Sequence, residues 1–335
     1  MQEHVDYVNI AKQVFSSKTY KRIVILIVFV ILVLSIYMFI TNVRIENVLK
    51  ADKSLLLIAI TLTVLVNFID ALRLMVLAFS IGYKMRFIDA LRARLMGNII
   101  ALATPSSIGG EPARALILSS YGIDIVKAAI ITLFEDYWDI VIVNVPALIL
   151  ALTRLPLSII IVLASLYNIM VWNILFFAPR VKKIRLLLEK LHECSKGIVH
   201  TIVGVLIRAI RSVNTVVDST RPGKIFIPIL ILTIIKYVVM MLTFFFAALS
   251  IESVSLTQSF EALLFYNAMG VIPTPGASGG LEYGLSLILK PIQVVMIRIV
   301  VFTTTLVIGL PLLIDYLRRR SIESFTDINI PTHST

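Results

Sequence analysis

Residues 104–112 read TPSSIGGEP and residues 274–282 read TPGASGGLE, each within strongly apolar sequence. In both stretches a Thr-Pro pair precedes a Gly-Gly pair at the same spacing, and a glutamate follows, Glu111 directly and Glu282 one residue later. Proline and consecutive glycines break a helix. At membrane depth a broken helix is tolerated only where protein buries it or where it lines a cavity. Two such breaks in corresponding halves indicate the binding site of a transporter built from repeats.

The residues at the two breaks are candidate hinge positions. We expect them to allow close backbone approach and hinge movement, because glycine adopts conformations that other residues avoid. They are Thr104, Pro105, Gly109 and Gly110 in the first motif and Thr274, Pro275, Gly279 and Gly280 in the second.

The composition is that of an integral membrane protein. The chain is 59% hydrophobic with a mean hydropathy of +0.96, and it contains runs of about 20 apolar residues, which can cross about 30 Å of hydrocarbon. The expected full spans are 23–41, 54–80, 124–150, 156–178, 224–250 and 290–316. Two pairs of apolar stretches are too short to cross, and one motif joins each pair: 88–103 with 110–121, and 258–272 with 279–289. The sequence therefore predicts an all-α integral membrane protein with about six transmembrane helices and two re-entrant helical hairpins.

The lysine and arginine positions predict the orientation, because cytoplasmic loops carry an excess of these residues. With the N-terminus inside, the inside segments hold 22 of the 31 basic residues. The outside segments hold five, at Arg44, Lys50, Lys53, Arg154 and Lys290. We therefore expect a multi-pass protein of the cell membrane, with cytoplasmic tails at 1–22 and 317–335 around a membrane domain at 23–316. A cleavable signal peptide is not expected, because a basic tail precedes the first apolar run.

This orientation makes the two halves an inverted repeat. The first hairpin would enter from the cytoplasm and the second from outside, so residues 54–150 and 224–316 would be related by inversion. Residues 180–222 between them form a basic connector, which we expect to lie on the inner leaflet against anionic headgroups. A regulatory or partner-binding role for this connector is the alternative.

Other classes of function have little support in the sequence. The net charge is +11, but no nucleic-acid module accompanies the basic residues, so nucleic acid is not an expected partner. Cys194 is alone, the histidines show no metal-ligand spacing, and phosphate-binding glycine loops and nucleophile motifs are missing. We expect no metal, no cofactor and no catalytic residue of a known motif. The sequence leaves homo-oligomerisation open.

Charged residues at membrane depth are candidates for function, because a charge near the bilayer centre costs a few kcal/mol or more. The cations are Arg73, Arg114, Lys236 and Arg298, and the acids are Asp70, Glu111, Glu135, Asp136, Asp139 and Glu282. Asp70 and Arg73 lie three residues apart on one helical face, which predicts an internal ion pair.

Glu135 and Asp139 share another helical face. In low dielectric they are expected to pair with Arg114 or Arg298, or one of them carries a proton. Asp136 is expected to point elsewhere. Arg114 and Arg298 are the candidate phosphate contacts, because guanidinium matches phosphate at two points and the helix N-termini after each Gly pair favour anions. Neutralisation of nearby acids is the alternative role for both arginines.

Several of these motifs resemble those of one membrane-protein family. The run GGEPARALILSSYGI, followed by a span with FEDYWD, is similar to the pattern GGEP-x-RA-x-LL…YG and ER-x-x-D. The run PTPGASGGLE resembles PTPGG-x-G-x-x-E, and Arg298 resembles an arginine of the last span. The chain thus resembles the transmembrane region of lysylphosphatidylglycerol synthases over about residues 20–316. Two positions depart from the family pattern: Asp136 stands where the family has arginine, and Ala277-Ser278 replaces glycine and an apolar residue.

This resemblance implies transport of lipid. In the bacterial synthases the region is implicated in flipping aminoacylated phospholipid, and a separate soluble domain makes that lipid. The sequence shows no such domain, so the expectation is a flippase-like translocator of an anionic or aminoacylated phospholipid, or of a polyprenyl-phosphate-linked lipid. The expected substrate-binding residues are Arg114 and Arg298 for phosphate, and Glu111, Glu135, Asp139 and Glu282 for neutralisation, proton uptake or a cationic headgroup.

Two alternatives remain at this point. One is an integral membrane transferase or hydrolase that acts on a lipid-linked substrate, with Glu111 or Glu282 as the general base. The other is a small-solute or ion transporter of similar architecture.

Overall fold

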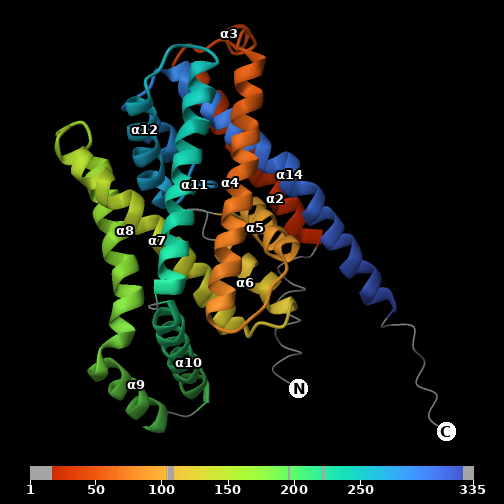
Figure 1. Ribbon diagram of the computed structural model, residues 1–335. Helices are drawn as coiled ribbons and strands as arrows, with labels where there is room; N and C mark the ends of the chain where they lie inside the picture. The colour runs from red at the N-terminus through yellow and green to blue at the C-terminus, as the bar shows by residue number, and fades with distance from the viewer. Residues whose placement is uncertain (1–16, 103, 105–108, 195–196, 221–222, 327–335) are drawn as a thin grey trace.

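The computed structural model describes residues 17–102, 104, 109–194, 197–220 and 223–326, and all regular structure in these ranges is helical (Figure 1). Pro105 and most of the two expected tails lie outside the described residues. The α-helices are α2 (Ser17–Ile40), α3 (Ile45–Val48), α4 (Lys53–Ser80), α5 (Phe87–Leu102), α6 (Gly110–Ser120), α7 (Ile125–Leu152), α8 (Ile159–Phe177), α9 (Lys182–Cys194), α10 (Gly197–Thr220), α11 (Gly223–Leu249), α12 (Leu256–Ala268), α13 (Gly280–Ser286) and α14 (Pro291–Thr326). Short 3₁₀ turns follow α8, η1 (Ala178–Arg180), and α12, η2 (Met269–Val271).

Four of the expected spans correspond to helices that are long and apolar enough to cross a membrane. They are Lys53–Ser80, Ile159–Arg180, Ile225–Leu249 and Pro291–Asp315. The other two expected spans differ in composition: α7 is as long as α4 but carries Glu135, Asp136 and Asp139, and α2 contributes the shorter apolar segment Ile27–Ile40. The chain is therefore an all-helical, multi-pass membrane protein.

Short helices flank each sequence break where the motifs predict them. In the first half α5 and α6 lie between the long helices α4 and α7, and in the second half α12 and α13 lie between α11 and α14. Both α6 and α13 begin at the second glycine of their motif, Gly110 and Gly280. Gly279 has a φ of 89°, which a residue with a side chain rarely adopts, so the second break requires glycine there.

The two halves pack against each other along α4 and α11, which run side by side through the middle of the bundle (Figure 1). Each half has an apolar core of its own, one built mainly from α4 to α7 and the other mainly from α11 to α14. The two breaks also meet, because the backbone N–H of Gly276 donates to the carbonyl of Thr104 at 3.2 Å. The motifs that are far apart in sequence therefore lie together in space.

The loops separate into two ends of the bundle. At one end the N–H of Asp52 donates to the carbonyl of Ser250 at 2.7 Å, and Lys290 pairs with Glu252. At the opposite end, where α9 and α10 lie in Figure 1, the Ser80 and Ser219 hydroxyls are 3.3 Å apart. The segments expected outside and those expected inside thus lie at opposite ends.

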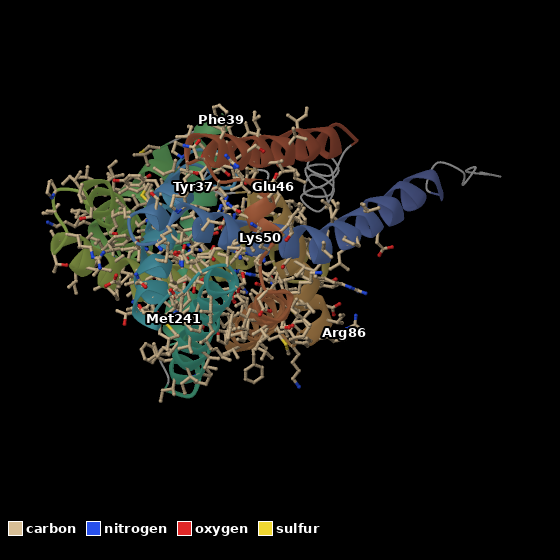
Figure 2. All side chains as sticks on the ribbon, turned by 90° about the horizontal axis from the view of Figure 1, so that it is seen from above. Tyr37, Phe39, Glu46, Lys50, Arg86 and Met241 are labelled. Carbon is tan, nitrogen blue, oxygen red and sulfur yellow. The ribbon has the colours of Figure 1, made fainter. Side chains whose placement is uncertain are left out.

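The outer surface of the bundle is apolar, as a lipid-facing surface requires. Seen from above in Figure 2, α2 lies against one side of the bundle and Phe39 points away from it, with 84% of its surface exposed. Further exposed large apolar residues occur on α4, α7, α8 and α11, for example Leu57, Ile149, Leu163 and Ile231. The polar groups of these helices face inward, where they build the site.

Candidate functional site

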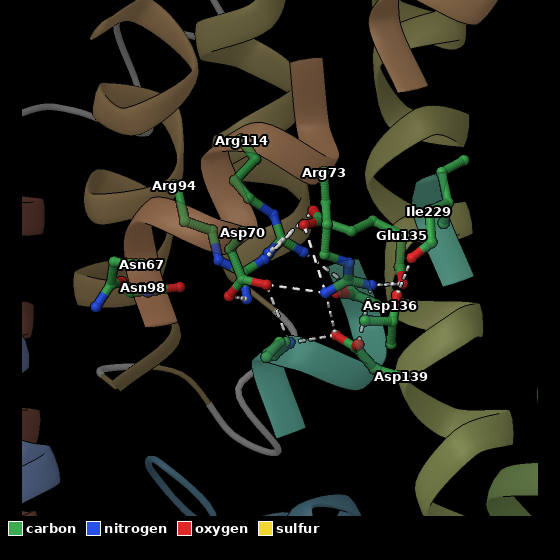
Figure 3. Close-up of polar contacts among 12 residues, drawn as sticks. Asn67, Asp70, Arg73, Arg94, Asn98, Arg114, Glu135, Asp136, Asp139 and Ile229 are labelled. Carbon is green, nitrogen blue, oxygen red and sulfur yellow. Dashed lines mark hydrogen bonds and ion pairs between the residues drawn. The ribbon is translucent and has the colours of Figure 1, made fainter. Parts of the chain in front are cut away.

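A network of charged side chains lies in the interior of the first half (Figure 3). Helical spacing brings its members to common faces, three residues apart on α4 and α6 and four apart on α7. Its cations are Arg73, Arg94, Arg114 and Lys236, and its acids are Asp70, Glu111, Glu135, Asp136 and Asp139.

Arg73 occupies the centre of this network and is fully buried. Its guanidinium lies 2.8 Å from Asp70 and 2.9 Å from Asp139. It also donates to the backbone carbonyl of Glu135 at 3.0 Å. The predicted Asp70–Arg73 ion pair is therefore present within α4. Arg73 also links α4 to α7 through Asp139 and the Glu135 carbonyl.

Lys236 connects the network to the second half. Its Nζ is 2.6 Å from Asp139 and 3.2 Å from Asp70. Asp70 also contacts the guanidinium of Arg94 at 2.7 Å. Because α11 supplies this lysine, two acids of the first half also contact a cation of the second half.

The third part of the network surrounds Arg114 on α6. Arg114 lies 2.6 Å from Asp136, 3.7 Å from Glu111 and 3.9 Å from Glu135. The expectation that Asp136 points elsewhere is wrong, because Asp136 is the nearest carboxylate to this arginine. Glu135 also contacts Arg94, at 3.3 Å.

Arg94 is the member that sequence reasoning missed. The sequence analysis counted it among the basic residues of the inside segments, but the structure buries it against Asp70 and Glu135. Its position within the apolar stretch 88–103 was the available signal, since α5 continues through that stretch.

Arg298 forms a separate site in the second half. Its Nε donates to Glu282 at 2.6 Å, and its other nitrogens lie 3.3 Å from the hydroxyls of Tyr266 and Ser278. Glu282 in turn accepts from the backbone N–H of Gly279 at 2.6 Å. Of the two arginines expected as partners for Glu135 and Asp139, Arg114 contacts Glu135 at 3.9 Å, whereas Arg298 is held by its own motif. Its contacts stabilise the second break.

The threonine of each motif bonds across its own break. The hydroxyl of Thr104 accepts from the N–H of Gly109 at 2.9 Å, and the hydroxyl of Thr274 donates to the carbonyl of Ser278 at 2.6 Å. Gly280 is also closely packed, since a Cβ there would lie 2.5 Å from Ile272. Each threonine thus forms a hydrogen bond to a residue on the other side of its break.

A cavity of about 580 Å³ lies between the two halves. Residues from α4 to α8 and from α11, α12, η2 and α14 line it. Of the predicted substrate-binding residues, Glu111 and Asp139 line this cavity, whereas Arg114, Arg298, Glu135 and Glu282 do not. The lining cations are instead Arg94 and Lys236.

The walls of the cavity differ in character. Helix α8 contributes an apolar stripe of Tyr167, Val171 and Leu175 to the lining, spaced four residues apart and all exposed. Neutral polar side chains complete the lining: Thr63, Asn67, Asn98, Asn144, Asn168, Thr243, Asn267 and Thr305. Such a chamber can hold a polar group while an attached hydrocarbon chain follows α8.

Carboxylates in this network are neutralised by cations of the chain. Within the part of the chain that the structure describes, no group of three or more His, Cys, Asp or Glu side chains is arranged to hold a metal ion. The network has four cations and five acids, so it carries one excess negative charge when all of them are ionised. Glu111 is the most exposed of these acids, with 24% of its side chain accessible.

The comparisons with known proteins identify the family. Residues 21–312 match the model described as the lysylphosphatidylglycerol synthase TM region, so the chain belongs to that family. The family is a membrane domain linked to lipid handling, and no soluble synthase domain is detected in this chain. Searches of the curated proteins and of the solved structures found no match.

Proposed function

We propose that this member of the lysylphosphatidylglycerol synthase TM family is a flippase-like lipid translocator. The observation that carries the proposal is the cavity between the two halves, whose lining combines charged groups with the apolar stripe of α8. The charged groups can bind a polar headgroup, and the apolar stripe can contact a hydrocarbon chain. A water-soluble solute has no hydrocarbon chain to contact this stripe, so the stripe favours a lipid over a small solute as the substrate.

The proposed topology has six membrane crossings and two re-entrant hairpins related by inversion. The repeated order of long and short helices supports it, as does the contact between the two breaks at Thr104 and Gly276. In this arrangement both termini are cytoplasmic in the cell membrane, and α9 and α10 lie on anionic headgroups of the inner leaflet. Exposed apolar residues of α9, such as Leu187 with 60% of its surface exposed, are suited to that interface.

The headgroup is proposed to bind among Arg94, Lys236 and Glu111. The two cations line the cavity and attract phosphate, and Glu111 supplies the excess negative charge for a cationic group or a proton. This assignment moves phosphate binding from Arg114 and Arg298 to the cations that face the cavity. Arg114 and Arg298 are assigned a positioning role: Arg114 holds Asp136, and Arg298 holds Glu282.

A bulky substitution on the apolar stripe tests the proposal directly. Val171→Trp places an indole in the cavity, and Ile174→Trp is the matched control, because Ile174 lies on α8, is 58% exposed and does not line the cavity. Both variants are reconstituted into liposomes with fluorescent short-chain lipids, and movement between leaflets is followed by quenching of outer-leaflet dye. We expect Val171→Trp to abolish lipid movement and Ile174→Trp to retain it.

The same liposome preparations also distinguish lipid translocation from the alternative functions. Equal lipid movement in both variants, or none in the unmodified protein, would contradict the proposal. Mass spectrometry of the recovered lipid tests for chemistry, and a chemically altered lipid would identify an enzyme with Glu111 as the candidate base. Glu282 is unsuited to that role, because Arg298 and the Gly279 N–H bind its oxygens.

A further inference from the structure

The threonines that line the cavity share one hydrogen-bonding pattern. The hydroxyls of Thr63, Thr243 and Thr305 each donate to the backbone carbonyl four residues earlier, at 2.8, 3.1 and 2.8 Å. A hydroxyl has a single hydrogen, so each of these oxygens has only lone pairs left for a further hydrogen bond.

The asparagines of the lining add further acceptors. Asn168 uses its amide nitrogen to donate to Asn144 at 3.0 Å and to the Ala268 carbonyl at 3.1 Å. The amide nitrogens of Asn267 and Asn98 also donate within the protein. Bonds to backbone carbonyls fix the orientation of Asn168 and Asn267, because only the NH₂ group can donate.

The oxygens of these amides are left available. The Oδ1 atoms of Asn98, Asn168 and Asn267 accept no hydrogen bond from the part of the chain that the structure describes. Together with the threonine oxygens they line the cavity from α4, α5, α8, α11, α12 and α14. The amides of Asn98 and Asn267 each keep one hydrogen, since each donates a single bond within the described chain. The neutral polar lining therefore offers more acceptors than donors, and a complementary ligand must carry several hydrogen-bond donors.

Donors come in two chemical classes, ammonium groups and hydroxyl groups. An ammonium requires a carboxylate without a close cation of its own. The aspartates that line the cavity each have such a cation: Asp70 has Arg94 at 2.7 Å, Asp136 has Arg114 at 2.6 Å and Asp139 has Lys236 at 2.6 Å. Among the lining carboxylates Glu111 lies farther from its cation, 3.7 Å from Arg114, so the lining offers one carboxylate for an ammonium beside several neutral acceptors. The neutral acceptors lie elsewhere on the wall, and neutral donors satisfy them without a charge.

We infer that the cavity recognises a polyhydroxylated lipid headgroup, such as a sugar or inositol, through this acceptor-rich wall. The inference rests on the proposed function, which places a lipid headgroup in the cavity. The volume of about 580 Å³ lies within the range of about 300–1,000 Å³ that is usual for ligand sites. Trp172 and Tyr237 add ring surfaces to the lining, against which the carbon skeleton of a polyol can pack.

Binding of matched headgroups tests this inference. The chain has two tryptophans, Trp138 and Trp172, and Trp172 lines the cavity. In a Trp138→Phe background, held in a neutral polymer without tryptophan or sugar groups, Trp172 fluorescence reports binding. The probes are dioctanoyl phosphatidylinositol, phosphatidylglycerol, phosphatidylethanolamine and phosphatidic acid, which differ only in the headgroup. We expect phosphatidylinositol to bind about tenfold tighter than phosphatidylethanolamine, with phosphatidylglycerol between them.

Threonine-to-valine variants identify the acceptors, because valine keeps the shape and removes the oxygen. Thr63→Val, Thr243→Val and Thr305→Val should each weaken phosphatidylinositol binding by about 2- to 10-fold and leave phosphatidylethanolamine binding unchanged. Thr233→Val is the matched control, because Thr233 is buried on α11 and bonds its Ile229 carbonyl at 2.8 Å but does not line the cavity. The three substitutions are made one at a time, so each variant can be compared with Thr233→Val after both are shown to fold.

The outcomes distinguish this inference from the proposed function. Tighter binding of phosphatidylethanolamine, or equal binding of all four probes, would overturn the inference, as would equal losses for the cavity variants and Thr233→Val. Lipid movement in liposomes could still persist in that case, and the proposed function would stand. Hydroxyl-dependent binding without any lipid movement would instead support the binding chemistry and refute translocation.

Discussion

Removal of Arg73 is predicted to destabilise the protein more than any loss of a surface ion pair. The side chain is fully buried and lies within 2.9 Å of both Asp70 and Asp139. Arg73→Met leaves these carboxylates without their central cation, and the excess negative charge of the network rises from one to two. Loss of one partner of a buried pair costs about 3–5 kcal/mol, because an uncompensated charge stays buried. At about 2 °C per kcal/mol for a large chain, we expect the thermal midpoint to fall by about 6–10 °C.

A compensating change tests the electrostatic reasoning. Arg73→Met with Asp139→Asn restores the original charge balance, and Lys236 keeps Asp70 at 3.2 Å as a partner. The double variant should therefore be more stable than Arg73→Met alone. The matched control is Arg154→Gln, which breaks the more exposed pair with Glu261 at 2.5 Å and should cost about 1 kcal/mol or less.

The assay is thermal unfolding of the purified full-length variants in one detergent, followed by intrinsic fluorescence. A loss for Arg73→Met no larger than that for Arg154→Gln would refute the energetic importance of the network. A double variant as unstable as Arg73→Met would refute the argument from charge balance, and would assign the loss to packing instead.

Three further predictions follow from other parts of the structure. Lys50→Cys should react with an impermeant maleimide on intact cells, whereas Cys194 should react only after permeabilisation; equal labelling of both would reverse the proposed orientation. Gly284→Ala should destabilise the protein by about 1–3 kcal/mol, because its Cβ would lie 2.6 Å from a backbone oxygen of α12, and an unchanged thermal midpoint would contradict that packing. Arg298→Gln should lower the thermal midpoint, and adding Glu282→Gln should restore part of the loss, since the pair at 2.6 Å is local to its motif; a further fall in the double variant would contradict the assignment.

The breaks in the helices could be predicted from the sequence because their causes are local. Helix α6 begins at Gly110 and α13 at Gly280, the second glycine of each motif. The conformational freedom of glycine and the missing N–H of proline act on the residue itself and its immediate neighbours. The same holds for the apolar runs that became α4, α8, α11 and α14, since the length of hydrocarbon to be crossed sets their length.

The presence of buried charges was also predictable, but their partners were not. A charge within an apolar run must be compensated wherever it lies, so the sequence indicated that Arg114, Glu135 and Asp139 have partners. The sequence did not predict that Asp136 pairs with Arg114 or that Arg298 pairs with Glu282, because the partner of a buried charge depends on the rotation of one helix against another. Sequence spacing describes positions within a helix and carries no information on that rotation.

The sequence by itself determined the helical membrane class, the position of the two breaks, the two ends of the bundle and the identity of most charged groups. Each of these depends on hydropathy, local backbone preference or charge placement along the chain. Only the tertiary structure decided that Arg94 joins the network, that Lys236 crosses from one half to neutralise acids of the other, and that Arg298 stays within its own motif. The cavity and its acceptor-rich wall also depend on tertiary structure. They form where helices distant in sequence meet, and the packing of those helices decides which side chains line the cavity.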